Sequence, residues 1–355
     1  MGRSTRYLIV MILLVNSASI KYYKELVTVA EKKISPNLSE SKRSFFKRFY
    51  WRDYVVYITF IIVFITFSAT LAQSGFLSSN NLLNIMRQSA IISVMAVAMT
   101  FVLATAEIDL SVGSVAGLAS VVTAMVIGKF GLVPGILGGL CTGLLVGFIN
   151  GTLVTRIGIP SFLVTLGMQG ITTGAAMWVT NTAPIPISNS TYVYVFGSGN
   201  FGPIPSLVFW TVIALVIGHV VLRSTPYGRQ ALATGGNEVA ARYSGINTKR
   251  IKLFTFIIMS TVASLAGMLY AGRMQSGRYQ WGQGDELSVI AAVVLGGTSM
   301  FGGKGTIIGT IIGAILIGLI NNGLILMGLS ASQQMIVRGA IIILAVALTG
   351  RKVQN

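Results

Sequence analysis

The chain has 355 residues, of which 53% are hydrophobic and only 10% are charged, and its formal net charge is +17. An ordinary soluble domain carries about a quarter charged residues, so this composition excludes a soluble globular protein. The basic excess could suggest nucleic-acid binding, but the 26 Lys and Arg residues surround apolar runs, as the orientation of membrane proteins requires. Nucleic acid is therefore not an expected partner.

Residues 1–53 form a basic extension that precedes the first apolar span. Its apolar run at 7–15 is too short to cross a membrane but has the length of a signal-peptide core. A small-residue cleavage site is not convincing apart from 16–19, so we do not expect cleavage. Apolar residues then recur at helical spacing among lysines, which favours a helix lying on anionic membrane lipid, with a poorly ordered extension as the alternative. The apolar residues of this helix are Tyr23, Leu26, Val27, Ala30 and Ile34.

Ten apolar runs follow, most of them with the roughly 17 to 25 residues that cross about 30 Å of hydrocarbon as a helix. We therefore predict an all-α fold, a polytopic membrane helix bundle over residues 54–350. The expected spans are 54–71, 85–105, 109–127, 132–155, 161–180, 205–222, 253–271, 287–301, 306–328 and 333–349.

The basic residues orient these spans. If the amino terminus is cytoplasmic, every Lys and Arg lies in a cytoplasmic segment except Arg87, Lys129, Arg273, Arg278 and Arg338. Cytoplasmic loops of membrane proteins carry such an excess, so both termini are expected in the cytoplasm.

Several spans carry glycines at a spacing of four residues, which places small surfaces along one face of a helix. Lipid provides no hydrophobic force between helices, so close van der Waals contact at small residues must supply much of the attraction. We expect other helices to pack closely against these faces. The glycines are Gly135, Gly139, Gly143, Gly147 and Gly151 in one span, Gly305, Gly309 and Gly313 in another, and Gly113 and Gly117 in a third.

The Gly-rich stretch at 296–305 invites comparison with a phosphate-binding loop. The comparison fails, because Thr298 occupies a position that requires glycine and Gly305 follows Lys304 where Ser or Thr is needed. A tight turn between two membrane helices is the better interpretation, and we expect no nucleotide site in the chain.

Polar residues in or near the spans are candidates to line a translocation path. Charged groups near hydrocarbon are costly unless hydrated or paired. Asp109 or Ser111 could instead cap the following helix, and the amide side chains could instead form bonds between helices. The path candidates are Glu107, Asp109, Ser111, Asn150, Gln169, Asn321 and Asn322.

No pattern indicates an enzyme or a bound cofactor. Cys141 is the single cysteine, which excludes an internal disulfide, and His219 is the single histidine, which excludes a multi-histidine metal site. The nine acidic residues form no recognisable pair for acid–base chemistry.

The polar loop 223–252 carries the signature of a short helix. Gly235 and Gly236 are expected to break the preceding chain, and Asn237 is a favoured N-cap. Glu238 suits the positive end of the helix dipole, and Gly245 can stop the helix. Two turns are not stable alone in water, so this helix should dock onto a partner, or else pack on its own membrane domain.

The Glu-x-Ala-Ala-x-x-x-Gly pattern at 238–245 resembles the coupling loop of ABC importer permeases. The segments 107–114, 235–246 and 291–323 are similar to ribose-type permeases of that superfamily, although Glu107 stands where many of them have glycine. The likeness covers roughly residues 53–350. It implies a bacterial inner-membrane subunit that works with a second permease chain, identical or different, a cytoplasmic ATPase and an external sugar-binding protein. The residues expected to meet the ATPase are Gly235, Asn237, Glu238, Ala240, Ala241 and Gly245.

On the outer face, Arg273 and Arg278 are candidates to meet acidic groups of the binding protein. The expected cargo is a monosaccharide such as ribose or a related small sugar. The main alternative is an ion-coupled secondary transporter of a small polar solute. Such a transporter would carry carboxylates at mid-membrane, and only Glu107 and Asp109 come near that description. A purely structural membrane partner is a third interpretation.

Overall fold

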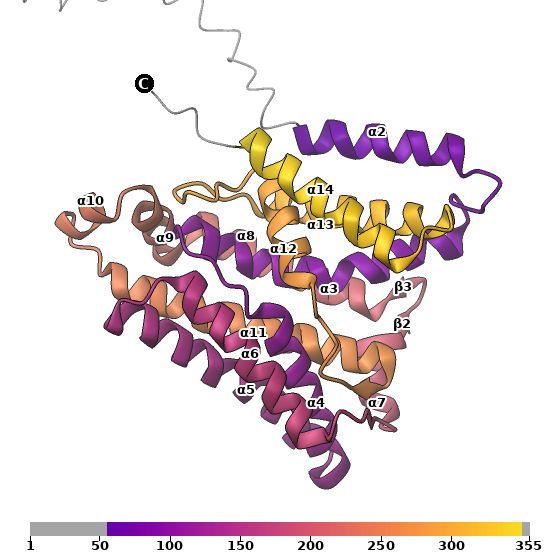
Figure 1. Cartoon of the computed structure of the whole chain (residues 1–355), viewed down its shortest axis with the longest axis horizontal. Helices are drawn as coiled ribbons and strands as arrows, with labels where there is room; N and C mark the ends of the chain where they lie inside the picture. Colours follow the sequence, from indigo (N-terminus) through magenta and orange to yellow (C-terminus); the bar gives the residue numbers. More distant parts are fainter. Residues whose placement is uncertain (1–54, 350–355) are drawn as a thin grey trace, which may run out of the picture. The chain divides into compact units, whose positions relative to one another are not determined.

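The computed structural model describes residues 55–349, so the expectation for 1–53 lies outside the described residues. The fold is a bundle of helices, which confirms the predicted all-α class (Figure 1). The long helices are α2 (Val55–Thr70), α3 (Ser79–Ala104), α4 (Val112–Phe130), α5 (Leu132–Thr152), α6 (Ser161–Thr180), α8 (Ser206–Ser224), α11 (Thr248–Met274), α13 (Ile307–Leu326) and α14 (Ala331–Thr349). The shorter ones are α7 (Ser190–Val193), α9 (Pro226–Gly236), α10 (Glu238–Tyr243) and α12 (Asp285–Leu295), with π-helical turns η2 (Leu153–Ile157) and η3 (Tyr194–Ser198).

Seven of the described helices are long and apolar enough to cross a membrane, namely α3, α4, α5 with η2, α6, α8, α11 and α13. Each coincides with a predicted span, because a long apolar run can satisfy its backbone in lipid only as a helix. α2 is a shorter apolar helix of 16 residues.

The expected span at 287–301 differs from the observed structure. Its helix, α12, has only 11 residues, or about 16 Å at 1.5 Å per residue, which is too short for about 30 Å of hydrocarbon. The chain reaches α12 from α11 through a non-helical stretch that follows strand β4 (Ser276–Gly277). Figure 1 shows this stretch as the thin orange loop that leads to α12. The predicted run is divided between α12, which ends at Leu295, and the non-helical loop 296–306 that follows it.

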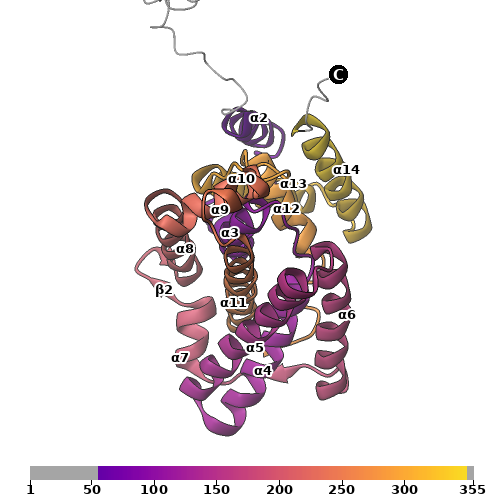
Figure 2. The ribbon, with the colours of Figure 1, turned by 90° about the vertical axis from the view of Figure 1, so that its left-hand side faces the viewer.

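The glycine faces pack closely against other helices, as expected. α11 packs against α3, α4 and α5, and it lies in the middle of the bundle in Figure 2. A Cβ on Gly147 of α5 would lie 2.6 Å from the carbonyl oxygen of Phe256 in α11, closer than real side chains allow. A Cβ on Gly143 would likewise overlap the carbonyl oxygen of Ser260. Only glycine permits these backbones to approach so closely.

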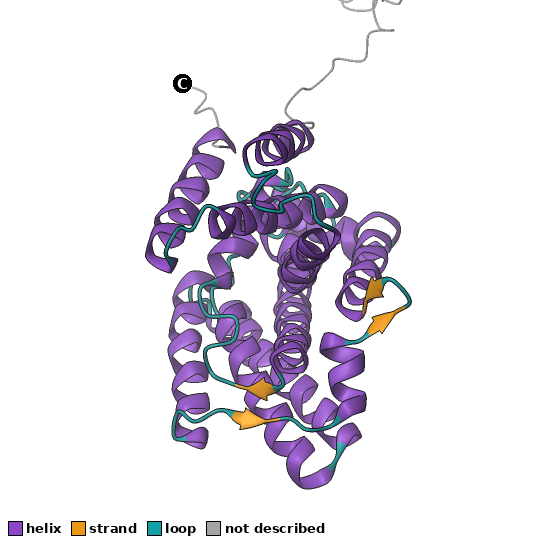
Figure 3. Ribbon diagram, turned by 90° about the vertical axis from the view of Figure 1, so that its right-hand side faces the viewer, coloured by secondary structure: helices purple, strands orange, loops and turns teal. Residues whose placement is uncertain are grey.

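The two ends of the bundle differ in structure. One end, the α10 end, holds α9, α10 and the loop 296–306, whereas the opposite end holds α7 and the strands (Figure 1). The strands form two short antiparallel pairs, shown in orange in Figure 3. β1 (Ile185–Pro186) pairs with β4, and β2 (Asn200–Phe201) pairs with β3 (Ile204–Pro205).

Candidate functional site

The predicted short helix at the α10 end is present as α10. The side-chain oxygen of Asn237 accepts a hydrogen bond from the backbone N–H of Ala240 at 3.0 Å, which caps the first turn. Gly245 has a φ of +84°, a left-handed conformation that ends the helix and that glycine adopts most easily. The cap and the stop are both confirmed.

The expectation that Gly235 and Gly236 break the chain is wrong. Both residues lie in the last turn of α9, and the helical path ends at Asn237, whose φ of −158° is extended. A Cβ on Gly235 would overlap the carbonyl oxygen of Ala104 at the end of α3. Gly235 is therefore needed for a close helix contact and not for a turn.

A network of charges holds α10 in place. The ammonium nitrogen of Lys252 in α11 lies 2.8 Å from Oε2 of Glu238 and 2.6 Å from Oε1 of Glu107. Arg242 also pairs with Glu238, and the Thr248 hydroxyl donates to the same carboxylate at 3.1 Å. Glu107, expected beside a translocation path, is thus joined to the helix expected to meet the ATPase.

Glu238 carries its charge at all physiological pH values. Burial raises the pKa of its carboxyl group, but the hydrogen bonds from Lys252 and Arg242 outweigh that effect and lower the pKa to about 2. The carboxylate is therefore a constant member of the network.

A cavity of about 460 Å³ opens between α10 and η2. Its wall includes the turn after η2, where Gly158 has a φ of +86°. The charged side chains that line it are Glu107, Arg156, Glu238, Arg242, Lys249 and Lys252.

Three path candidates meet in a fully buried cluster between α4 and α5. One oxygen of Asp109 accepts hydrogen bonds from the backbone N–H of Ser111 at 2.9 Å and from its hydroxyl at 2.6 Å. Asn150 donates to the Ser111 hydroxyl oxygen at 3.1 Å. Ser111 precedes α4 but makes no side-chain capping bond. The cluster therefore fixes the segment before α4, and neither Asp109 nor Ser111 caps the helix in the predicted manner.

A row of polar side chains runs along one face of α6 toward the middle of the bundle. Ser161 accepts from the backbone N–H of Ile108 at 3.2 Å, and Thr165 accepts from that of Leu110 at 3.1 Å. Farther along, Thr172 donates to Ser114 at 2.7 Å. The spacing of these α6 residues keeps them on one helix face, so α6 holds the chain that leads into α4.

Gln169, on the same face, donates to a carboxylate oxygen of Glu286 in α12 at 3.2 Å. Glu286 is only 9% exposed and was missed by the sequence reasoning. The available signal was an Asp-Glu pair directly before an apolar run, preceded by Gly284. Charged residues inside a membrane span are rare and mark functional sites.

The remaining path candidates do not join this region. Asn322 of α13 and Asn81 of α3 exchange two side-chain hydrogen bonds of 2.8 and 3.0 Å, which makes Asn322 a bond between helices. The side-chain oxygen of Asn321 is buried and has no hydrogen-bond partner among the described residues.

Comparison with known proteins identifies the chain. Residues 81–346 match the family described as "Branched-chain amino acid transport system / permease component". The chain belongs to this permease family. It is 39% identical over 296 residues to the ribose import permease protein RbsC of Escherichia coli K12, an alignment that covers 82% of this chain and 92% of that protein. It is 40% identical over 295 residues to RbsC of Bacillus subtilis 168, with 82% and 91% coverage. It is 34% identical over 313 residues to the D-allose transport system permease protein AlsC of E. coli K12, with 87% and 95% coverage. No solved structure matches the chain.

The permease is therefore a multi-pass membrane protein and a transport component, not an enzyme.

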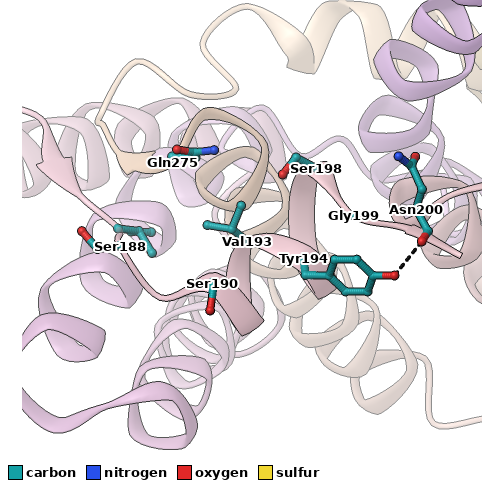
Figure 4. A pocket seen from close by; sticks show the side chains of 9 residues that line it. Ser188, Ser190, Val193, Tyr194, Ser198, Gly199, Asn200 and Gln275 are labelled. Carbon is teal, nitrogen blue, oxygen red and sulfur yellow. Dashed lines mark hydrogen bonds between the residues drawn. The ribbon is translucent and has the colours of Figure 1, made fainter.

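At the end of the bundle opposite α10, a second cavity of about 490 Å³ is lined by uncharged side chains, as Figure 4 shows. The hydroxyl of Tyr194 donates to the backbone oxygen of Asn200 at 2.6 Å and shapes its wall. The sequence reasoning missed this cavity because its residues come from two separate parts of the chain. Its polar lining consists of Ser188, Ser190, Tyr194, Ser198, Asn200 and Gln275.

The two arginines expected to meet a binding protein lie near this end and are half-buried. The guanidinium of Arg278 lies over the ring of Trp281, 5.8 Å from its centre. Arg273 follows at the end of α11, and Arg87 is close enough to act on it electrostatically. Neither arginine lines the second cavity.

Proposed function

We propose that the chain is the membrane-spanning permease subunit of an ATP-driven, binding-protein-dependent importer for a monosaccharide such as ribose. The named relatives are ribose and allose permeases aligned over more than nine-tenths of their length, which supports a sugar cargo. The family description names branched-chain amino acids, whereas the named relatives within it are sugar permeases.

The observation that carries this proposal is the form of α10. One face of the helix is fixed to the permease, since Ala241 is buried and Glu238 is tied to Lys252. The other face exposes Val239 at 62% and Tyr243 at 90%, and their spacing of four places them side by side. An apolar pair presented on an anchored, polar loop is suited to docking into a groove of a partner. The ATPase is the partner that we assign to it, with Gly235, Asn237, Glu238, Ala240, Ala241 and Gly245 shaping the helix.

We assign the α10 end to the cytoplasm. The predicted orientation places both termini on that side, so that residues 1–53 form a cytoplasmic extension and 54–350 form the membrane domain with its coupling loop 223–252. The opposite end then faces the sugar-binding protein, with Arg273 and Arg278 available to acidic groups. Charge reversal at both arginines should abolish uptake that depends on the binding protein. Unchanged uptake would contradict the assignment of Arg273 and Arg278 to the contact with the binding protein.

A second permease chain is expected at the exposed apolar surface. Only 28% of the most apolar 18-residue stretch of α6, and 22% of that of α8, is buried in the single chain, although both helices are strongly apolar. Such faces meet lipid or another subunit, and an importer of this kind pairs two permeases. Copurification of two differently tagged copies from mixed membranes tests whether the pair is a homodimer.

The function is tested by reconstituting the permease with its ATPase and binding protein in proteoliposomes and measuring sugar uptake. Uptake should require ATP and the binding protein and should survive collapse of the proton gradient. Uptake that persists without the ATPase but stops when the gradient is collapsed would favour the secondary transporter instead.

A further inference from the structure

Two helices of the permease begin inside the bundle instead of at its ends. α4 starts at Val112 after the non-helical stretch 105–111, and α12 starts at Asp285 after the non-helical stretch 278–284. Gln169, which bonds to Glu286 in the first turn of α12, is the ninth of the 20 residues of α6. The start of α12 therefore lies near the middle of a membrane-length helix. Interrupted helices that meet near the midplane form the substrate sites of several transporter folds.

The starts of α4 and α12 are in direct contact. A Cβ on Gly282 would lie 2.7 Å from the carbonyl oxygen of Gly113, and a Cβ on Gly113 would overlap that of Gly282. The same Cβ on Gly113 would lie 2.6 Å from Oε2 of Glu286. Glycine at both positions thus allows the two helix starts and the carboxylate to occupy one small region.

Buried acceptor oxygens without donors surround the first turn of α4. Among the described residues, Oδ2 of Asp109, Oδ1 of Asn150 and Oε2 of Glu286 have no hydrogen-bond partner. Asp109 and Asn150 are fully buried, and Glu286 is 9% exposed. A buried acceptor without a donor destabilises the protein, because it has lost its hydrogen bonds to water and gained none in return. Their chemical complement is a ligand that carries several hydrogen-bond donors.

The stretch 278–284 is also open on one side. One side of this stretch packs closely on α4, since a Cβ on Gly117 would overlap the carbonyl oxygen of Tyr279. On the other side, the side chains of Gln280 and Gln283 are exposed. Polar, non-helical chain at this depth is stable only where it meets protein or a water-filled passage. This face of the permease is therefore suited to a polar cargo.

We propose that the cargo, an uncharged polyhydroxyl molecule, binds at this junction and that its hydroxyl groups donate hydrogen bonds to Glu286 and to the Asp109–Asn150 pair. Gln169 positions the Glu286 carboxylate by donating a hydrogen bond to its Oε1 atom. Glu286 forms no ion pair with a described residue, so its charge is available to the ligand. This site rests on the proposed function, because it assigns a sugar-like cargo to the same importer.

The test uses the complete importer, with ATPase and binding protein, in proteoliposomes supplied with a panel of radiolabelled pentoses and hexoses. The Glu286→Gln variant keeps the shape of the side chain and removes its charge. Sugar transported per ATP hydrolysed should fall about tenfold or more, because a charge-assisted hydrogen bond is replaced by a weaker neutral one. Thr310→Val is the matched control. It removes a buried hydroxyl of α13 that bonds to Thr100 at 3.0 Å, away from the junction, and should leave the ratio unchanged.

Discrimination between sugars separates cargo binding from a structural role. Uptake of a deoxy analogue that the binding protein still delivers should fall less in Glu286→Gln than uptake of the parent sugar, because the analogue lacks one donor. If uptake of the parent sugar and of the deoxy analogue falls equally, or if the sugar transported per ATP matches the wild type, the site is overturned. Normal uptake by the wild type would leave the proposed function intact in that case. A sodium requirement that disappears in Glu286→Gln also overturns the site, since it assigns the oxygens to a cation. Absence of ATP-driven uptake of every sugar by the wild type overturns the proposed function and the site together.

Discussion

Lys252 and Glu107 form an ion pair of 2.6 Å that joins α11 to the chain between α3 and α4. Their side chains are only 15% and 11% exposed, so water screens the pair weakly. The two residues are far apart in the sequence, and the pair connects the loop that carries α10 to the segment that carries Asp109.

We predict that Lys252→Met destabilises the permease by about 2 to 4 kcal/mol, because it leaves the buried Glu107 carboxylate without its counter-charge. Lys252→Arg should retain most of the stability. The double variant Lys252→Met/Glu107→Gln should recover part of the loss, which thermal unfolding of the purified permease would measure. Equal stability of Lys252→Met and the wild type would contradict the pairing.

The exposed apolar face of α10 predicts a loss of ATPase binding in Tyr243→Asp. The ring is 90% exposed, so its replacement should leave the fold of the permease intact while removing a docking contact. Copurification with the ATPase measures the effect, and we expect a loss of at least about tenfold. Tyr194→Ala, an exposed tyrosine at the opposite end, is the control and should copurify normally.

Neighbouring glycines of α9 should respond differently to alanine. Gly235→Ala places a methyl group on the carbonyl of Ala104, and the forced separation of α9 from α3 should cost about 1 to 3 kcal/mol and reduce uptake. Gly236→Ala meets nothing closer than 3.7 Å and should be neutral or slightly stabilising. The pair is compared by thermal unfolding and by uptake, and similar behaviour of the two variants would refute the close contact.

The glycine face of α5 predicts a second contrast. Gly143→Ala should destabilise the permease, because its methyl group overlaps the carbonyl oxygen of Ser260 and pushes α5 away from α11. Gly170→Ala in α6 has open space around the new methyl group and serves as the control. Detergent-resistance assays of the two variants should show loss only for Gly143→Ala.

Local patterns allowed most of the helices to be predicted from the sequence. Hydropathy located the long spans because each must satisfy its own backbone in lipid. The Asn237 cap and the Gly245 stop were predictable because both depend on residues within one or two turns. The glycine face of α5 was also visible, since its spacing repeats along the chain.

Contacts between distant segments were beyond the sequence. Glycine is typical of turns, so the sequence suggested a turn at Gly235. The residue lies in a helix instead, and it is glycine because a Cβ there would overlap the carbonyl oxygen of Ala104. The predicted span 287–301 ends early, at Leu295, and the close approach of the next residue, Gly296, to Gly309 of α13 is a contact that no local pattern reveals. Glu286 stands at the edge of an apolar run, and its depth became apparent only through its bond to Gln169.

The charge network around Lys252 also determines how easily α10 can separate from the membrane domain. It contains two carboxylates and two cations, and these divide into Glu238 with Arg242 on α10, and Glu107 with Lys252 on the membrane domain. If α10 is drawn away, the ion pair between Glu238 and Lys252 breaks, together with the hydrogen bonds of Glu238 and Arg242 to Thr248, but each side keeps an electrically neutral pair. No lone charge is left at the surface of the bilayer, where it would be costly. The arrangement thus allows a reversible detachment of α10 whose electrostatic penalty is small.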